Sequence, residues 1–67
     1  MEVIVNGRPL MVKTKEPTLT TLLEQLGLGD EPFAVAVNEV CIGKAEHRTT
    51  RLTAGDRVEI VAPMAGG

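Results

Sequence analysis

The sequence is almost without aromatic residues: it has no Trp and no Tyr, and Phe33 is its single Phe. Nucleic-acid bases would therefore find no aromatic platform on which to stack. Seven basic residues against nine acidic ones give a net charge of -2, which leaves no excess of positive charge for binding phosphates. We therefore expect no nucleic-acid partner.

Cysteine and histidine are equally scarce, because Cys41 and His47 are each the only residue of their type. One Cys cannot form a disulfide framework, and the two residues cannot supply the ligands of a structural zinc site. No apolar run approaches the roughly 20 residues of a membrane span. The first residues lack the basic and apolar regions of a signal peptide. We expect a cytoplasmic protein that contacts no membrane.

The N-terminal segment predicts a β-hairpin in a chain whose 67 residues suffice for one small domain. Val3 and Val5 alternate with Ile4, as in a strand with one buried face. Asn6-Gly7 favours a two-residue type I′ turn, because both central positions of that turn need positive φ. The returning strand is expected over 10–14, with Pro9 at its start.

A change of period predicts one helix after this hairpin. Four leucines at helical spacing form a single apolar stripe: Leu19, Leu22, Leu23 and Leu26. Thr18 is the expected N-cap and Gly27 the expected left-handed C-cap. Thr21 with Glu24 matches a capping box.

The second half of the chain predicts three more strands. They are expected over 33–38, over 40–42 as a short edge strand, and over 57–62 with Val58 and Ile60 inward. Residues 44–50 have no apolar side chain larger than Ala and are expected to form a surface loop, which Leu52 anchors.

A single helix must cover one face of one sheet, since nothing else can shield it. The crossover through the helix favours a mixed sheet in which the last strand enters the centre beside the first. The predicted fold class is α+β: a ubiquitin-like β-grasp, with a mixed sheet of four to five strands and one main helix packed on one face. We expect the β-grasp domain to span residues 1–62 and residues 63–67 to form a flexible C-terminal tail ending in Gly-Gly.

The side chains offer no recognisable catalytic set, because nucleophilic catalysis needs a nucleophile, a base and a group that orients the base. His47 lies in the most polar stretch and is expected to be a solvated loop residue. Cys41 lies between Val40 and Ile42 and is expected to be a buried or half-buried small hydrophobic residue. We expect no enzyme activity from this chain, no metal site and no bound cofactor.

The C-terminal end is the remaining candidate for chemistry. Pro63 cannot extend a strand ladder, so a short tail is expected to follow the last strand. Gly66 and Gly67 have no side chains and could enter a narrow channel. The terminal carboxylate is a poor electrophile, but adenylation by ATP would convert it into a mixed anhydride, open to attack by a sulfur or nitrogen nucleophile.

Three segments resemble the sulfur carriers of thiamine biosynthesis, the ThiS family. They are Val35-Ala36-Val37-Asn38, the run from Ala54 to Val61, and the terminus Pro63-Met64-Ala65-Gly66-Gly67. The resemblance implies a carrier whose Gly67 is adenylated by an E1-like ATP-dependent enzyme and converted to a thiocarboxylate. It also implies delivery of the sulfur to a thiazole synthase, with cysteine as the ultimate source through a desulfurase. ATP would belong to the activating enzyme.

Three other functions remain open at this stage. The small subunit of molybdopterin synthase uses related chemistry, although it is usually longer and its tail tends to lack the Pro-Met pair. A ubiquitin-like protein modifier would also use Gly67. A non-covalent β-grasp binding module would leave the terminus unused.

The sheet face without a helix is the expected docking surface. Alternation along the strands places Ile4, Ala34, Ala36 and Val61 on it, with Arg57 and Glu59 flanking them. We expect these small and apolar residues, together with Pro63, Met64 and Ala65 of the tail, to contact the partner enzymes.

Overall fold

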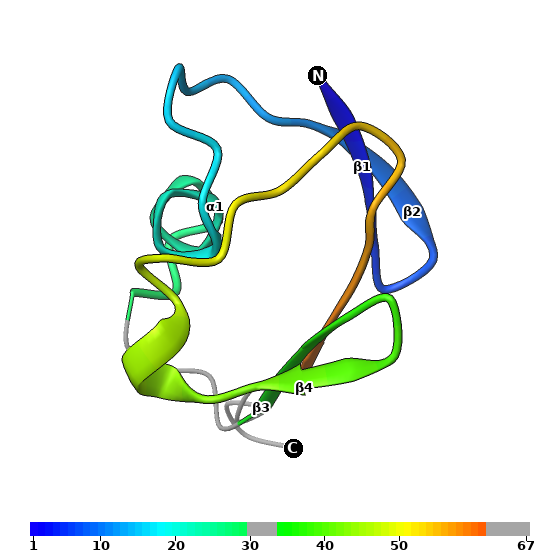
Figure 1. The fold of residues 1–67 in the computed structure, drawn as a ribbon. Helices are drawn as coiled ribbons and strands as arrows, with labels where there is room; N and C mark the ends of the chain where they lie inside the picture. The colour runs from blue at the N-terminus through cyan, green and yellow to red at the C-terminus, as the bar shows by residue number, and fades with distance from the viewer. Residues whose placement is uncertain (30–33, 62–67) are drawn as a thin grey trace, which may run out of the picture.

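The computed structural model describes residues 1–29 and 34–61 as a five-stranded sheet with one α-helix (Figure 1). In chain order the elements are β1 (Glu2–Val5), β2 (Arg8–Met11), α1 (Leu19–Gln25), β3 (Ala34–Val37), β4 (Val40–Ile42), a short 3₁₀ helix (Lys44–Glu46) and β5 (Arg57–Val61). No helix among these described residues has the length and hydrophobicity needed to cross a membrane. Phe33 and Ala62, which bound two of the predicted strands, lie outside the described residues, and so does the predicted tail 63–67.

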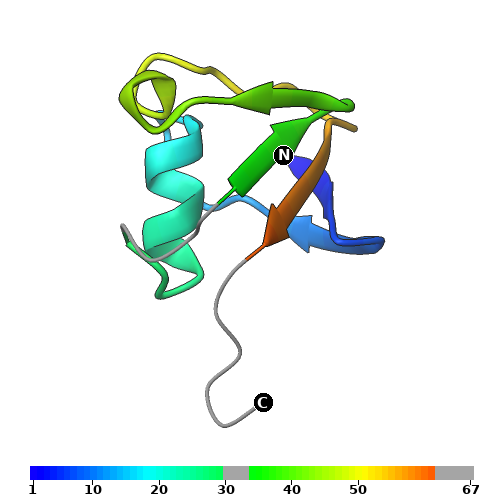
Figure 2. The ribbon, with the colours of Figure 1, turned by 90° about the horizontal axis from the view of Figure 1, so that it is seen from below.

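The strands lie in the order β2-β1-β5-β3-β4. β1 and β5 pair in parallel, whereas β1 with β2, β3 with β4 and β3 with β5 pair antiparallel. The last strand therefore lies between the first and the third, as in the predicted mixed sheet. Figure 2 shows α1 on one side of this sheet. The predicted β-grasp fold class is confirmed.

The core lies between α1 and the inner face of the sheet. Leu19 and Leu22 are fully buried together with Val3 and Val58 from the two parallel strands. Val5 and Ile60, which alternation places on the buried face, pack against this cluster, and so do Val37 and Leu26. Burying a side chain of this kind stabilises the fold by roughly 1.5–3 kcal/mol, so the leucine stripe is what holds the helix to the sheet.

Residues within and next to α1 cap both of its ends. Thr18 Oγ1 accepts from the Thr21 N–H at 3.2 Å, and Thr21 Oγ1 accepts from the Thr18 N–H at 2.9 Å. The capping box thus pairs Thr18 with Thr21; the predicted pairing of Thr21 with Glu24 is wrong, because the helix begins one turn earlier, at Leu19. At the other end, Gly27 has the predicted positive φ of 77°.

The first hairpin turns at Asn6-Gly7, with φ of 48° and 83°. β2 runs over Arg8–Met11 rather than over the predicted 10–14. The two-residue turn pairs Val5 directly with Arg8, and β1 begins at Glu2, so the ladder ends at Met11. Pro9 lies within β2, which is tolerated because β2 is an edge strand.

Residues 44–52 are more ordered than the predicted loop, since they begin with a 3₁₀ helix and then cover the start of α1. The Leu19 N–H donates to the Thr50 carbonyl at 3.0 Å, and the Thr20 N–H donates to the His47 carbonyl at 3.3 Å. These bonds satisfy N–H groups that have no partner inside a helix. Leu52 is buried, as predicted.

Asp56 closes the turn that leads into β5. Its carboxylate accepts from the Thr53 N–H at 2.8 Å, from the Thr53 hydroxyl at 3.0 Å and from Asn38 Nδ2 at 3.0 Å. Partial burial raises the pKa of Asp56, but these hydrogen bonds outweigh it and hold the pKa below its ordinary value of 3.8.

We predict that the stabilisation by Asp56 is complete above its ordinary pKa and is lost as the pH falls through the lower folded-state pKa. Asp56→Asn should lower the free energy of unfolding by about 1 kcal/mol at neutral pH. The difference from the wild type should be constant well above the ordinary pKa and should shrink as the pH falls through the lowered folded-state pKa. Urea unfolding across this pH range measures it, with the exposed Glu59→Gln as the control. A difference that is independent of pH would contradict this role.

Candidate functional site

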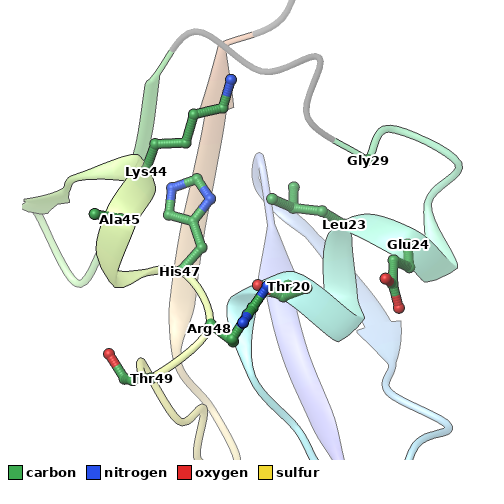
Figure 3. A pocket seen from close by; sticks show the side chains of 9 residues that line it. All are labelled: Thr20, Leu23, Glu24, Gly29, Lys44, Ala45, His47, Arg48 and Thr49. Atoms are coloured by element: carbon green, nitrogen blue, oxygen red, sulfur yellow. The ribbon is translucent and has the colours of Figure 1, made fainter.

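A hollow lies between α1 and the segment 44–49 (Figure 3). It is open and has a volume of about 410 Å³. Its lining combines both charges with small polar groups: Thr20, Leu23, Glu24, Gly29, Lys44, Ala45, His47, Arg48 and Thr49.

His47 lines this hollow and is only 8% exposed, so the prediction of a solvated histidine is wrong. The physical reason is the packing of residues 47–50 over the start of α1. No hydrogen bond from the imidazole to Thr20, Thr49 or any other described side chain is present, so it is not paired with a nucleophile. Within residues 1–29 and 34–61, no group of three His, Cys, Asp or Glu side chains could hold a metal ion.

Cys41 is exposed, which corrects the prediction of a buried or half-buried residue. It pairs with Ala36 across the edge of the sheet, and Ile42 pairs with the buried Val35. Since neighbouring residues of a strand point to opposite faces, Ile42 lies toward the core and Cys41 lies on the open face. The alternation within Val40-Cys41-Ile42 carried this signal in the sequence.

The open face of the sheet is defined by the strand register. Ile4 pairs with Pro9 on one side and with Arg57 on the other. Ala36 pairs with Cys41 and with Glu59, and Ala34 pairs with Val61. All four residues predicted for docking therefore lie on the face opposite α1; Ile4 and Ala36 are half-buried, and Ala34 and Val61 are exposed.

These four residues form two clusters rather than one. Ile4 lies beside Arg57, and Val61 is four residues further along β5, which is about 13 Å of strand. Arg57 and Glu59 occupy the intervening positions of this face. Ala34, Ala36, Val61 and Cys41 form the β3–β5 cluster, at the end of β5 that leads toward the C-terminus.

The second cluster includes two residues that sequence reasoning missed. Pro9 pairs with Ile4, and Met11, which is 54% exposed, pairs with Glu2. Together Ile4, Pro9 and Met11 form the β1–β2 cluster. The available signal was the alternation of Pro9 and Met11 with the inward Leu10 and Val12 within the predicted strand and at its start.

Charged residues separate the two clusters. Arg57 forms an exposed ion pair with Glu39 at 3.5 Å, and both line a small hollow of about 150 Å³ that also includes Ile4 and Glu59. Exposed ion pairs contribute little to stability. We call Arg57, Glu59 and Glu39 the charged band. In protein interfaces, charges of this kind affect orientation and the rate of encounter more than affinity.

The predicted reacting residues, Gly66 and Gly67, lie outside the described residues. So do the predicted tail contacts, Pro63, Met64 and Ala65. The structure describes the strand from which they continue, up to Val61.

Comparison with known proteins gives matches over the whole chain. The family model described as the ThiS family matches residues 3–67, which includes both terminal glycines. The crystal structure of a thiamine biosynthesis protein (ThiS) from Geobacter metallireducens is 29% identical with a TM-score of 0.80, and the match covers 100% of both chains. An NMR solution structure of a thiamine biosynthesis protein from the same organism is 29% identical with a TM-score of 0.79, covering 100% of this chain and 88% of that one. No curated protein sequence matches the chain.

We predict that the Cys41 thiol of the folded protein reacts with an aromatic disulfide reagent within about tenfold of its rate in urea, because its accessibility controls the reaction. Absorbance of the released thiolate measures both rates. Cys41→Ser should give no reaction and should change the free energy of unfolding by less than about 0.5 kcal/mol. Strong protection of the native thiol would contradict the position of Cys41 on the open face.

Proposed function

The chain belongs to the ThiS family, and from this membership we propose that it is a sulfur carrier of thiamine biosynthesis whose reacting group is the C-terminal carboxylate of Gly67. The observation that carries the proposal is the family match, because it extends through Gly66 and Gly67. The full-length similarity to the Geobacter protein supports it. The chain then acts as a carrier and co-substrate, and the catalysis belongs to separate enzymes.

The proposed chemistry needs no side chain of the carrier. A carboxylate oxygen of Gly67 attacks the α-phosphorus of ATP, and pyrophosphate leaves. The outer sulfur of a persulfide, formed from cysteine by a desulfurase, then attacks the glycyl carbonyl and AMP leaves. A thiol attacks the enzyme's own sulfur in the resulting acyl disulfide, so that a new disulfide forms and the acyl-bound sulfur is released. The product is a thiocarboxylate, and the absence of side chains on Gly66 and Gly67 leaves its carbonyl accessible.

We assign the first step to an E1-like adenylating enzyme and the final delivery of sulfur to a thiazole synthase. ATP binds to the adenylating enzyme, so no cofactor is needed on this chain. Each partner must hold the domain while it admits the last residues, Pro63, Met64, Ala65, Gly66 and Gly67, into its active site. The open sheet face offers the surface for this purpose.

The β3–β5 cluster is the better placed of the two apolar clusters. Val61 is 60% exposed and is followed directly by the C-terminal residues. Ala34 and Ala36 beside it are small, so a partner can approach the sheet closely at this point. The β1–β2 cluster, with Ile4, lies on the far side of the charged band and would form the outer part of the contact.

We predict that deletion of Gly67 abolishes carrier activation and leaves the fold unchanged, because every described element ends by Val61. The measurements are ATP–pyrophosphate exchange with the E1-like enzyme and the intact mass, in which replacement of oxygen by sulfur marks the thiocarboxylate. Cys41→Ser is the control and should be activated like the wild type. Retained exchange after the deletion would contradict the assignment of Gly67.

Genetic rescue distinguishes the related functions. We expect the chain to restore growth of a strain that requires thiazole but not of a strain that lacks the molybdenum cofactor. The opposite pattern would assign it to molybdopterin synthesis, covalent protein adducts would assign it to a modifier, and an unchanged mass would leave a non-covalent binding module.

We predict that Ile4→Glu combined with Val61→Glu raises the KM for the carrier in adenylation by at least about tenfold, because two charges are placed on the docking face. Val40→Glu is a matched control: Val40 is also 60% exposed, but it pairs with Val37 on the helix side of the sheet. Circular dichroism checks folding, and the single variants tell the two clusters apart. An unchanged KM for the folded double variant would exclude this face.

A further inference from the structure

The amide side chain of Asn6 completes the hydrogen bonding of β5 on the side of β1. Its Oδ1 accepts from the Ile60 N–H at 2.8 Å, and its Nδ2 donates to the Ile60 carbonyl at 3.2 Å. The Asn6 N–H also donates to the Val58 carbonyl at 2.9 Å. One residue of the first hairpin turn therefore makes three bonds to the last strand.

These bonds occur where the parallel ladder stops. The pairing of β1 with β5 ends at Val5 and Val58, because the chain turns away at Asn6-Gly7. A longer β1 would offer one more peptide group to Ile60. The Asn6 amide, with one acceptor and two donor hydrogens, takes the place of that peptide group.

Asn38 provides an internal comparison at the opposite end of β5, where its Oδ1 also accepts from a β5 N–H, although its Nδ2 donates to Asp56 rather than to a β5 carbonyl. It is also a turn residue, with φ of 51° against 48° for Asn6. Its Oδ1 accepts from the Arg57 N–H at 2.9 Å, and its own N–H donates to the Arg57 carbonyl at 2.7 Å. Asn38 therefore holds the start of β5, whereas Asn6 holds its end.

The segment that carries the proposed reacting group starts at the end of β5, since residues 62–67 continue the chain from Val61. On the β1 side, only Asn6 among the described residues bonds to the Ile60 peptide groups. If this support is lost, the last two residues of β5 keep their pairing with β3 alone. The position of Ile60 and Val61, from which the C-terminal residues continue, then becomes less well defined.

We propose that Asn6 is a positioning residue for the C-terminal carboxylate: it fixes the end of β5 so that Gly67 reaches the active site of a docked partner. This inference rests on the proposed carrier function. Asn suits the role because it tolerates positive φ better than most residues and carries both a donor and an acceptor. Asp would keep the acceptor but lose the donor to Ile60.

The test compares Asn6→Gly with Asn38→Gly, because Gly preserves the positive φ of both turns and removes only the amide. Native-state hydrogen exchange of the Ile60 amide should accelerate at least about tenfold in Asn6→Gly but not in Asn38→Gly, in which the Arg57 amide should accelerate instead. In adenylation by the E1-like enzyme, kcat should fall about tenfold for Asn6→Gly with KM within about twofold. Asn38→Gly should retain kcat within about twofold, and Asn6→Asp should be intermediate.

The two readouts separate the possible failures. If Ile60 exchange accelerates but both Gly variants retain the wild-type kcat, Asn6 supports β5 without positioning the carboxylate, and the proposal is overturned. Equal losses of kcat in both variants would also overturn it, because they would reflect general destabilisation. If the wild-type protein is not adenylated, the proposed function fails, and the positioning role fails with it.

Discussion

Strand β5 lies between β1 and β3, so each of its edges must be hydrogen-bonded by a segment that precedes it in the chain. This requirement sets the rest of the architecture. The helical crossover returns the chain to the correct side, and the two hairpins become the two halves of the sheet. Val58, the second residue of β5, is fully buried in the core between the sheet and the helix. The C-terminal residues accordingly continue from the central strand of the described sheet.

The strands are short, and side-chain amides take over where the backbone ladders end. Asn6 and Asn38 complete the two ends of β5. Gln25 does the same between α1 and the chain after β2: it accepts from the Lys13 N–H at 3.1 Å and donates to the Met11 carbonyl at 2.9 Å. An amide side chain presents the same donor and acceptor as a peptide group, so each one extends a ladder without lengthening a strand.

Several of the confirmed features depend on nearby residues, whereas the sheet order was predicted from the need of a single helix to cover one face of one sheet. The turn at Asn6-Gly7, the leucine stripe and the C-cap at Gly27 follow from local geometry. The chemistry proposed for Gly67 stays a prediction. The burial of His47 depends on packing between distant segments, and the exposure of Cys41 depends on the register of β4 with β3. For the same reason the sequence could not reveal that Arg57 and Glu59 divide the open face into two clusters.

The central place of β5 also has a consequence for folding. β1 with β2 and β3 with β4 form local hairpins that can pair early, but the bonds between Asn6 and Ile60 join residues 54 positions apart. Closing such long loops is slow compared with forming local contacts. During synthesis, the β1 edge of the first hairpin and the β3 edge of the second must therefore stay unpaired until β5 leaves the ribosome. The order of synthesis thus makes completion of the sheet coincide with the emergence of the segment that the proposed function uses.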